Sequence, residues 1–427
     1  MIGVASFLAL LFVGVEASAL QPLQTFVDGA RTSNNQRKVA RASREQAEGQ
    51  ATAALGTNLP SLNGTAALTH SQLDPPQPAN GDNGGGSLRI PRNIYYLSGG
   101  ITVPLSVGNW EKHAASRAQV RSAHADERAT AITVQRSVTQ AYYEVVGAEA
   151  VLGAVKHRLE LAQSNANVIL ARAKEGESSA LDVERSRNDV ARAQQDVADA
   201  DGNVLRARRR LFSLTQVDPE PGTTPDLLAD DLHSEGPASA WMARNQTTRP
   251  AVEKASAQRE AAARNRDAAA AAWLPTVSAQ VAENYTNLTE SLGRKDFYTV
   301  LGIAQWKLDL TKAGTQKAES AALAGAKAAE AQARLDSQDA VYDAWVQVET
   351  DIAKVRSARV GAASAKHAME LSREQYAAGE STQIEVLQAE QDYVEAEVAR
   401  VRVDADLAYA RAALRLAVAD GNDPAAR

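Results

Sequence analysis

The feature of this sequence that most constrains its fold is an internal repeat of constant spacing. The stretch AKEGESSALDV reappears as YAAGESTQIEV, which places Gly176 and Gly379 203 residues apart. Loops change length readily, whereas stacked structural repeats keep theirs. The spacing therefore predicts two similar rods in which each residue has a fixed height. The same offset relates further identical pairs without a gap, from Tyr95 and Tyr298 to Leu211 and Leu414.

Each copy is predicted to contain the same series of elements. Leu59-Pro60 and Leu274-Pro275 mark a helix-to-strand break in both copies, and the first copy has an additional Pro/Gly/Asn-rich loop at 74–86. Each copy then consists of a helix, the Leu-Pro break, two strands joined by a loop, a very long helix, a glycine turn and a second long helix.

Composition and periodicity favour long helices. Aromatic residues make up only 5% of the chain, and long stretches contain little besides Ala, Val, Leu and charged or amide residues, which is typical of coiled helices. No proline interrupts 108–174, so one helix there would extend roughly 100 Å. Gly176 suits a helix C-cap, and the next helix should fold back antiparallel. That helix has a seven-residue apolar period at Val183, Val190, Val197, Val204 and Leu211.

Four segments alternate between apolar and polar residues and are predicted strands, at about 61–70, 95–107, 276–287 and 297–308. Their length suits tilted membrane strands. A soluble antiparallel sheet with one buried face is the alternative. Four strands cannot close a barrel, and lipid tolerates no open sheet edge, so a membrane location requires several chains to share one sheet.

Several classes of function are excluded by the residues. The net charge is −6 without basic blocks, which excludes nucleic acid as a partner, and there is no cysteine. The six histidines never pair at helical spacing, so we expect no metal. No catalytic motif is present, so we expect no enzyme activity and no cofactor. An apolar run followed by Ala17-Ser18-Ala19 predicts a signal peptide over 1–19.

Together these features resemble the TolC-like outer-membrane efflux and secretion channels of Gram-negative bacteria. The resemblance rests on the duplication, both Leu-Pro steps, YYLSGGITVPL, FYTVLGIAQWKL, QAYYEVV and the two glycine turns. It implies a mainly α fold with a small β part. Long antiparallel coiled-coil helices would form an α-barrel, and four membrane β-strands per chain would join in a trimer that shares a 12-stranded β-barrel.

The resemblance also implies a division of the chain. The expected parts are a first repeat at 20–214 with helices 108–174 and 178–214, and a linker or equatorial segment at 215–240. A second repeat at 241–419 has helices 311–377 and 381–418, and a tail follows at 420–427.

Site residues follow from the resemblance by position. A gate or lumen constriction is expected at Glu385, with Gln388 where the family has a second acid, and at Asp182 in the first copy. The tips expected to contact the adaptor are Glu175, Gly176, Glu177, Ser178, Gly379, Glu380 and Ser381. The membrane-facing strand positions are expected to be Tyr95, Leu97, Ile101, Tyr298, Val300 and Trp306.

The function implied is a passive conduit from the periplasm to the exterior. Its partners would be two further copies in a homotrimer, a periplasmic adaptor (membrane fusion protein), an inner-membrane transporter and outer-membrane lipid. The chain would reside in the outer membrane and extend into the periplasm. The alternative is a soluble periplasmic coiled-coil scaffold. The residues do not discriminate between a drug, a metal ion and a protein as cargo.

Overall fold

A computed structural model describes residues 20–70, 92–220, 230–244, 249–287 and 295–418. The predicted signal peptide, the loop at 74–86 and the tail at 420–427 lie outside this part of the chain. The chain divides into two compact units. One contains 40–127 and 250–335, and the other contains 1–39, 128–249 and 336–427. Each unit thus takes a piece of both repeats, so the repeats and the compact units are different divisions of the chain.

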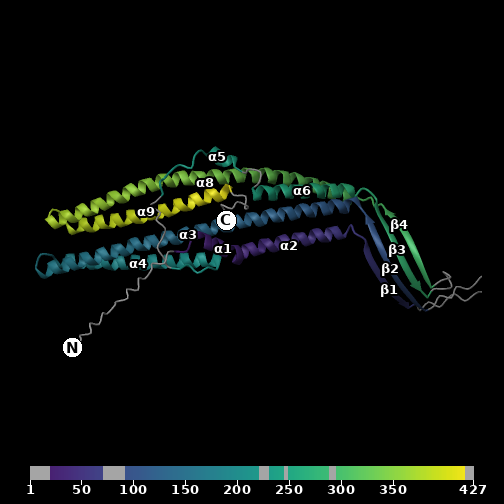
Figure 1. The fold of residues 1–427 in the computed structure, drawn as a ribbon, viewed down its shortest axis with the longest axis horizontal. Helices are drawn as coiled ribbons and strands as arrows, with labels where there is room; N and C mark the ends of the chain where they lie inside the picture. Colours follow the sequence, from purple (N-terminus) through teal and green to yellow (C-terminus); the bar gives the residue numbers. More distant parts are fainter. Residues whose placement is uncertain (1–19, 71–91, 221–229, 245–248, 288–294, 419–427) are drawn as a thin grey trace, which may run out of the picture. The chain divides into compact units, whose positions relative to one another are not determined.

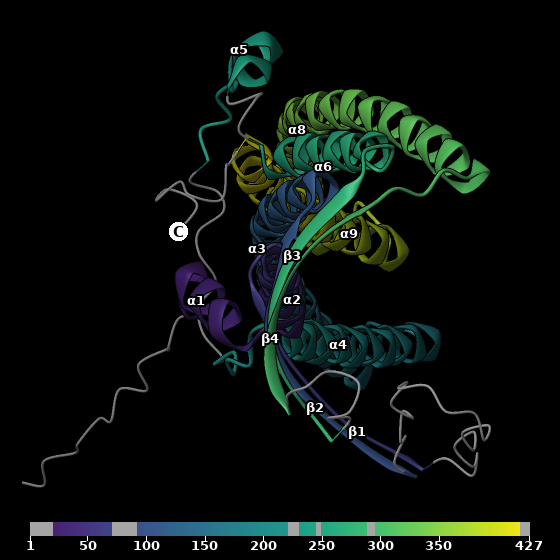
Figure 2. The ribbon, with the colours of Figure 1, turned by 90° about the vertical axis from the view of Figure 1, so that its right-hand side faces the viewer.

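The first of these, the sheet unit, contains a four-stranded antiparallel sheet in the order β1-β2-β3-β4 (Figures 1 and 2). The strands are β1 Ser61–His70, β2 Asn93–Leu105, β3 Thr276–Thr286 and β4 Asp296–Gln305. Their ends differ by a few residues from the predicted ones: β2 begins and ends earlier than 95–107, and β4 ends before 308. Within this unit, α6 (Pro250–Ala271) precedes β3 through the Leu274-Pro275 step.

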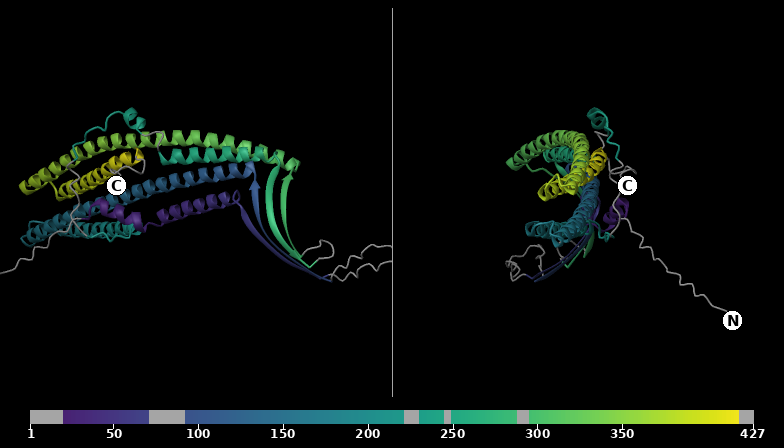
Figure 3. Two further views of the ribbon diagram at one scale, coloured as in Figure 1. Left: turned by 45° about the vertical axis from the view of Figure 1, so that its right-hand side comes forward. Right: turned by 90° about the vertical axis from the view of Figure 1, so that its left-hand side faces the viewer.

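Cross-strand register confirms the predicted alternation. Leu62, Ile101, Val281 and Val300 are aligned across all four strands and so share one face. The next row, on the opposite face, consists of Asn63, Gly100, Ala282 and Thr299. One face is therefore mostly apolar, with Glu283 of β3 as a charged exception aligned with Gly99 and Tyr298, and the other face is mostly small and polar. The strands lie side by side in Figure 3.

Trp306 corrects one strand assignment. It was expected on a membrane-facing strand, but β4 ends at Gln305 and Trp306 lies beyond it. The indole Nε1 of Trp306 donates to the carbonyl of Trp273 at 2.9 Å. The ring is thereby held at the helix-to-strand step, because the indole N–H needs a partner that the ladder cannot provide.

The second unit, the hairpin unit, holds the two helical hairpins. They are α3 (Val107–Lys174) with α4 (Ala180–Thr215), and α8 (Leu310–Ala378) with α9 (Gln383–Val418). Both long helices begin in the sheet unit and continue without a break into this one. Ser186, Ala193 and Ala200 are buried on α4, as the seven-residue period requires of the inner face.

Two apolar cores stabilise the hairpins. The first gathers Phe26, Val138, Val145 and Leu211. Phe26 comes from α1 (Leu23–Ser33), which is separate from α2 (Asn35–Gly56), so the single helix predicted before the Leu-Pro step is two. Asn34 makes the break, because its side-chain oxygen accepts from the amide of Gln36 at 2.9 Å, a local cap that replaces the helical bond.

The second core includes Trp241 of α5 (Ala238–Ala243), packed with Val341, Val348 and Leu414. The predicted boundary at 240/241 therefore falls inside a helix and has to be moved. The sequence signal for this short helix was the segment with Trp241 and Met242, whose side chains pack against α8 and α9.

The preceding linker is fixed to α9 by Arg411. The guanidinium of Arg411 donates to the carboxylates of Asp230 at 3.1 Å and Glu235 at 2.9 Å. The indoles of Trp241 and Trp345 donate to the carbonyls of Glu235 and Gly236, both at 2.8 Å. These bonds order the described part of the linker.

Over the described ranges, no helix is both long and apolar enough to cross a bilayer.

Replacing Leu211 by Ala tests the first core. Leu211 is 0% exposed, so Leu211→Ala should lower the free energy of unfolding by about 2–5 kcal/mol through lost burial and a residual cavity. Leu205→Ala on the same helix, where the side chain is 61% exposed, is the matched control and should cost much less. Chemical denaturation of the purified proteins compares them, and equal shifts of the midpoint would contradict this core.

Candidate functional site

The two glycine turns have the same backbone structure. Gly176 and Gly379 have φ of 83° and 81°, a left-handed conformation that glycine adopts without strain. The amide after each glycine donates five residues back, Glu177 to the carbonyl of Arg172 at 2.9 Å and Glu380 to that of Gln375 at 2.8 Å. Both turns are Schellman caps that satisfy the last carbonyls of α3 and α8.

The acids expected at a gate take part in helix caps. The Ser179 hydroxyl accepts from the Asp182 amide at 3.1 Å, and the Asp182 carboxylate accepts from the Ser179 amide at 3.3 Å. In the second copy the Glu385 carboxylate accepts from the Thr382 amide at 2.7 Å, and the Glu385 amide donates to the Thr382 hydroxyl at 3.4 Å. These are reciprocal capping boxes at the starts of α4 and α9.

The remaining predicted tip residues lie at the surface of the turns. Gln388 is exposed, and its amide donates to Asp392 at 2.8 Å one turn along α9. Ser381 is half-buried and donates to the carbonyl of Ser372 at 3.3 Å. Ser178 is half-buried, and the other five expected contact residues are exposed: Glu175, Gly176, Glu177, Gly379 and Glu380.

Two contacts join the hairpins at their turns. Gln383 is 6% exposed, and its amide donates to the carbonyl of Asp182 at 3.4 Å. The Arg172 guanidinium lies 5.3 Å from the centre of the Tyr376 ring. Sequence reasoning missed both contacts, and the repeat held the signal: at the offset of 203, Gln383 corresponds to Ala180. The two copies therefore differ at the position that makes the contact between them.

Ion pairs connect the two helices of each hairpin, a few turns away from the glycine turn. Arg158 on α3 contacts Asp189 at 3.1 Å and also Asp196, both on α4. Arg373 on α8 donates to the side chain of Glu390 on α9 at 2.7 Å. Because Glu390 is buried, removing Arg373 would leave a charge without its partner.

The second candidate surface is the apolar face of the sheet. Tyr95, Leu97, Ile101, Tyr298 and Val300 are all exposed, and Val300 is 70% exposed. They fall on one face by register, together with Leu62 and Val281. A sheet face this rich in exposed apolar side chains, although Glu283 interrupts it, marks a surface that another phase or chain covers.

In the part of the chain that the structure describes, no group of three or more His, Asp or Glu side chains could hold a metal ion.

Removing one cap tests the turn structure. Ser179→Ala should destabilise the first turn of α4 by about 1 kcal/mol, because the Asp182 amide loses its acceptor. Hydrogen exchange of the α4 amides should accelerate near residue 182 and not at the helix centre. Ser178→Ala, one residue earlier, is the control; if both variants exchange alike, Ser179 is not the cap.

Several solved structures share this fold. The Campylobacter jejuni CmeC outer membrane channel has a TM-score of 0.81 at 17% identity, covering 99% of this chain and 94% of that chain. CusC has a TM-score of 0.81 at 18% identity, covering 93% and 91%. A membrane protein from Pseudomonas aeruginosa has 0.80 at 20% identity, covering 93% of each chain. No curated protein matches in sequence.

The family profile described as "Outer membrane efflux protein" matches 27–215 and 242–420. These two ranges follow the two repeats and together cover most of the chain. The match decides against a soluble scaffold and against an enzyme, because members of this family are efflux channels of the outer membrane that extend into the periplasm and catalyse no reaction. The chain belongs to the outer membrane efflux protein family.

Proposed function

We propose that three copies of this chain form a passive conduit of a tripartite efflux system. The conduit receives its substrate from a periplasmic adaptor and an inner-membrane transporter and releases it outside. The observation that carries this proposal is the sheet, which has one mostly apolar face and two open edges, β1 and β4. A chain with this sheet needs further copies before it can enter lipid.

The equal lengths of the two edge strands support a closed assembly. β1 and β4 each pair with one neighbour only, and each has 10 residues. Equal lengths allow β1 of one copy to pair with β4 of the next along the whole edge. Three sheets joined in this way form a twelve-stranded barrel without an open edge, in which the backbone N–H and C=O groups of all strands are paired.

The polar face of the sheet supports a water-filled interior. The Tyr96 hydroxyl donates to the side-chain oxygen of Asn284 at 2.7 Å, and the Asn284 amide donates to the Thr299 hydroxyl at 3.1 Å. Asn63 on β1 donates to the Thr102 hydroxyl at 2.8 Å. Such a face suits a lumen, and its hydrogen-bonding side chains would be costly in lipid.

Exposed apolar side chains on the long helices support the helical part of the assembly. Tyr342, Val346 and Val360 on α8 are exposed in a single chain. In the trimer they would pack on helices of the neighbouring copies and form the α-barrel. The linker, ordered by Arg411, would lie in the belt around that barrel, and 20–214 and 241–419 would be its two sectors.

The gate would lie at the helix turns. Asp182, Glu385 and Gln388, which lie near the turns, would line it, and the exposed residues of 175–178 and 379–381 would form the surface offered to the adaptor. The Gln383–Asp182 and Arg172–Tyr376 contacts hold the two turns of one chain together. Their loss would let the two turns separate and widen the path at the gate.

An arginine on the apolar face tests the barrel. Val300→Arg should destabilise the membrane-inserted barrel by about 2–4 kcal/mol at the bilayer midplane, because lipid does not solvate the guanidinium. Outer-membrane assembly should therefore be impaired. Thr299→Arg, on the opposite face of the same strand, should be tolerated. Heat-resistant trimer in outer-membrane fractions is the measurement. Equal trimer yield from both variants would exclude the assignment of Val300 to the lipid-facing side and Thr299 to the opposite side.

Loosening the turns tests the gate. Gln383→Ala removes the amide that reaches Asp182 and should raise single-channel conductance in planar bilayers several-fold. The control is Gln391→Ala, an exposed glutamine two turns along α9. Conductance of Gln383→Ala equal to that of the control would contradict a gate held by this contact while leaving the conduit itself intact.

A further inference from the structure

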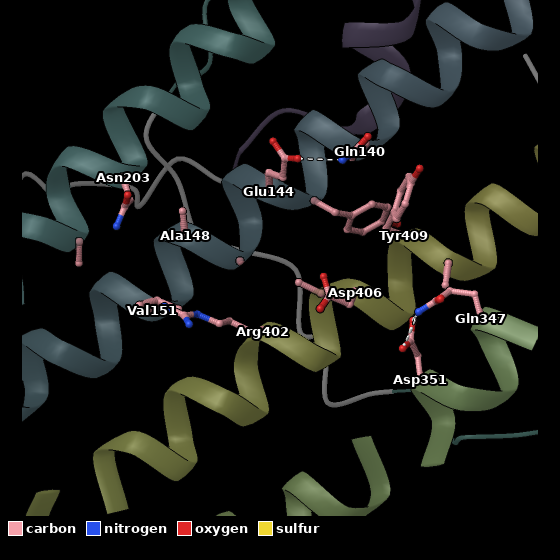
Figure 4. Close-up of a pocket in the computed structure, with 15 residues that line it drawn as sticks. Gln140, Glu144, Ala148, Val151, Asn203, Gln347, Asp351, Arg402, Asp406 and Tyr409 are labelled. Atoms are coloured by element: carbon pink, nitrogen blue, oxygen red, sulfur yellow. Dashed lines mark hydrogen bonds between the residues drawn. The ribbon is translucent and has the colours of Figure 1, made fainter. Parts of the chain in front are cut away.

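The hairpin unit contains a cavity of about 650 Å³ between α3, α4, α8 and α9 (Figure 4). Small residues leave the space: Ala148 on α3, Ala200 on α4 and Ala405 on α9 all line it. A Cβ at Gly147 would lie 3.2 Å from that of Ala405, so the helices approach closely at one side of the cavity. The volume is in the range of small-molecule sites.

Two of the three carboxylates that line the cavity are already paired. Glu144 accepts from Arg210 at 2.7 Å. Asp351 is buried and accepts from Lys354 at 2.9 Å and from Gln347 at 2.8 Å. Each therefore has a cation of its own, and neither charge is available to a ligand as a full counter-ion.

Asp406 is the carboxylate that remains. It extends from α9 into the space facing α3 (Figure 4) and makes no hydrogen bond or ion pair within 4 Å to any residue that the structure describes. Burial raises the pKa of Asp406, the nearby Asp351 carboxylate raises it further, and Lys354 and Arg402 lower it. The Asp406 carboxylate is still reachable from solvent.

The other walls suit the body of an organic cation. Tyr143 and Tyr409 line the cavity from α3 and α9, and aromatic faces attract cations electrostatically. Val151 and the small residues add apolar surface. Arg402 is the only positive side chain among the residues that line this cavity, and it is exposed, so Asp406 is the one lining carboxylate that no lining or neighbouring cation of the described chain pairs directly.

We propose that this cavity is a binding site for an organic cation, a protonated amine carried on an aromatic or apolar body. The ammonium group pairs with Asp406, and the body lies against Tyr143 and Tyr409. The site belongs to the hairpin unit of a single chain, so it requires neither the trimer nor the partners of the proposed conduit.

Equilibrium binding to the full-length protein in neutral detergent tests the site, with rhodamine 6G as the cationic probe and fluorescein as the anionic one. Fluorescence anisotropy should show saturable binding of rhodamine 6G. Asp406→Asn should weaken it about tenfold through loss of the charged partner, and Asp406→Glu should largely retain it. Arg402→Gln should tighten binding several-fold, because a like charge is removed.

Two further variants separate the site from a general effect. Ala148→Leu fills the cavity without changing charge and should reduce rhodamine 6G binding. Asp392→Asn removes a carboxylate from the same helix outside the cavity and should leave binding unchanged. Far-UV circular dichroism verifies that each variant is folded. If Asp406→Asn does not fold, Ala148→Leu and Arg402→Gln still test the site, with Asp406→Glu as the variant that keeps the charge.

Three results would overturn the proposal. One is rhodamine 6G binding that does not saturate, as partition into detergent would give. Another is binding that Asp406→Asn leaves unchanged in a folded protein. The third is saturable binding of fluorescein that Arg402→Gln abolishes, which would make the cavity an anion site.

Discussion

The edges of a four-stranded sheet are the constraint on which the rest of this molecule depends. β1 and β4 each leave one row of backbone N–H and C=O groups unpaired, and the face between them is apolar. Water could form hydrogen bonds with the edge strands, and lipid could solvate the apolar face, but neither solvent can do both. Joining edges between copies, as in the proposed trimer, would remove the conflict.

The two repeats share a backbone plan and differ in what their arginines do. Arg208 and Arg411 are equivalent at the offset of 203. Arg208 donates to Glu149 within the first hairpin at 3.0 Å. In the second hairpin the residue equivalent to Glu149 is Ile352, so Arg411 is released to bind Asp230 and Glu235 of the linker. One substitution of an acid by an apolar residue thus turns an internal ion pair into an anchor for the segment that joins the repeats.

Much of the fold was readable because periodicity and repetition are properties of sequence. The alternation of the strands was predicted, and the register confirmed that Leu62, Ile101, Val281 and Val300 share one face. The turns followed from Gly176 and Gly379. What escaped were features that depend on spatial neighbours: the short helix α5 with its buried Trp241, the placement of Trp306 outside β4, and the link from Gln383 to Asp182. Asp182 and Glu385 also show that an acid near a turn can be recruited by the nearest free backbone amide.

The capping boxes have a mechanical consequence. Because each turn closes its own backbone hydrogen bonds through Ser179 and Thr382, the end of a hairpin is a self-contained stiff piece. In the proposed gate, moving the two turns apart would therefore unravel no helix, and at the turns it would break the hydrogen bond from Gln383 to Asp182 and the Arg172–Tyr376 contact, together on the order of 1–3 kcal/mol. A docking protein of ordinary affinity could supply that much, so the contacts at the turns themselves would add little resistance to opening.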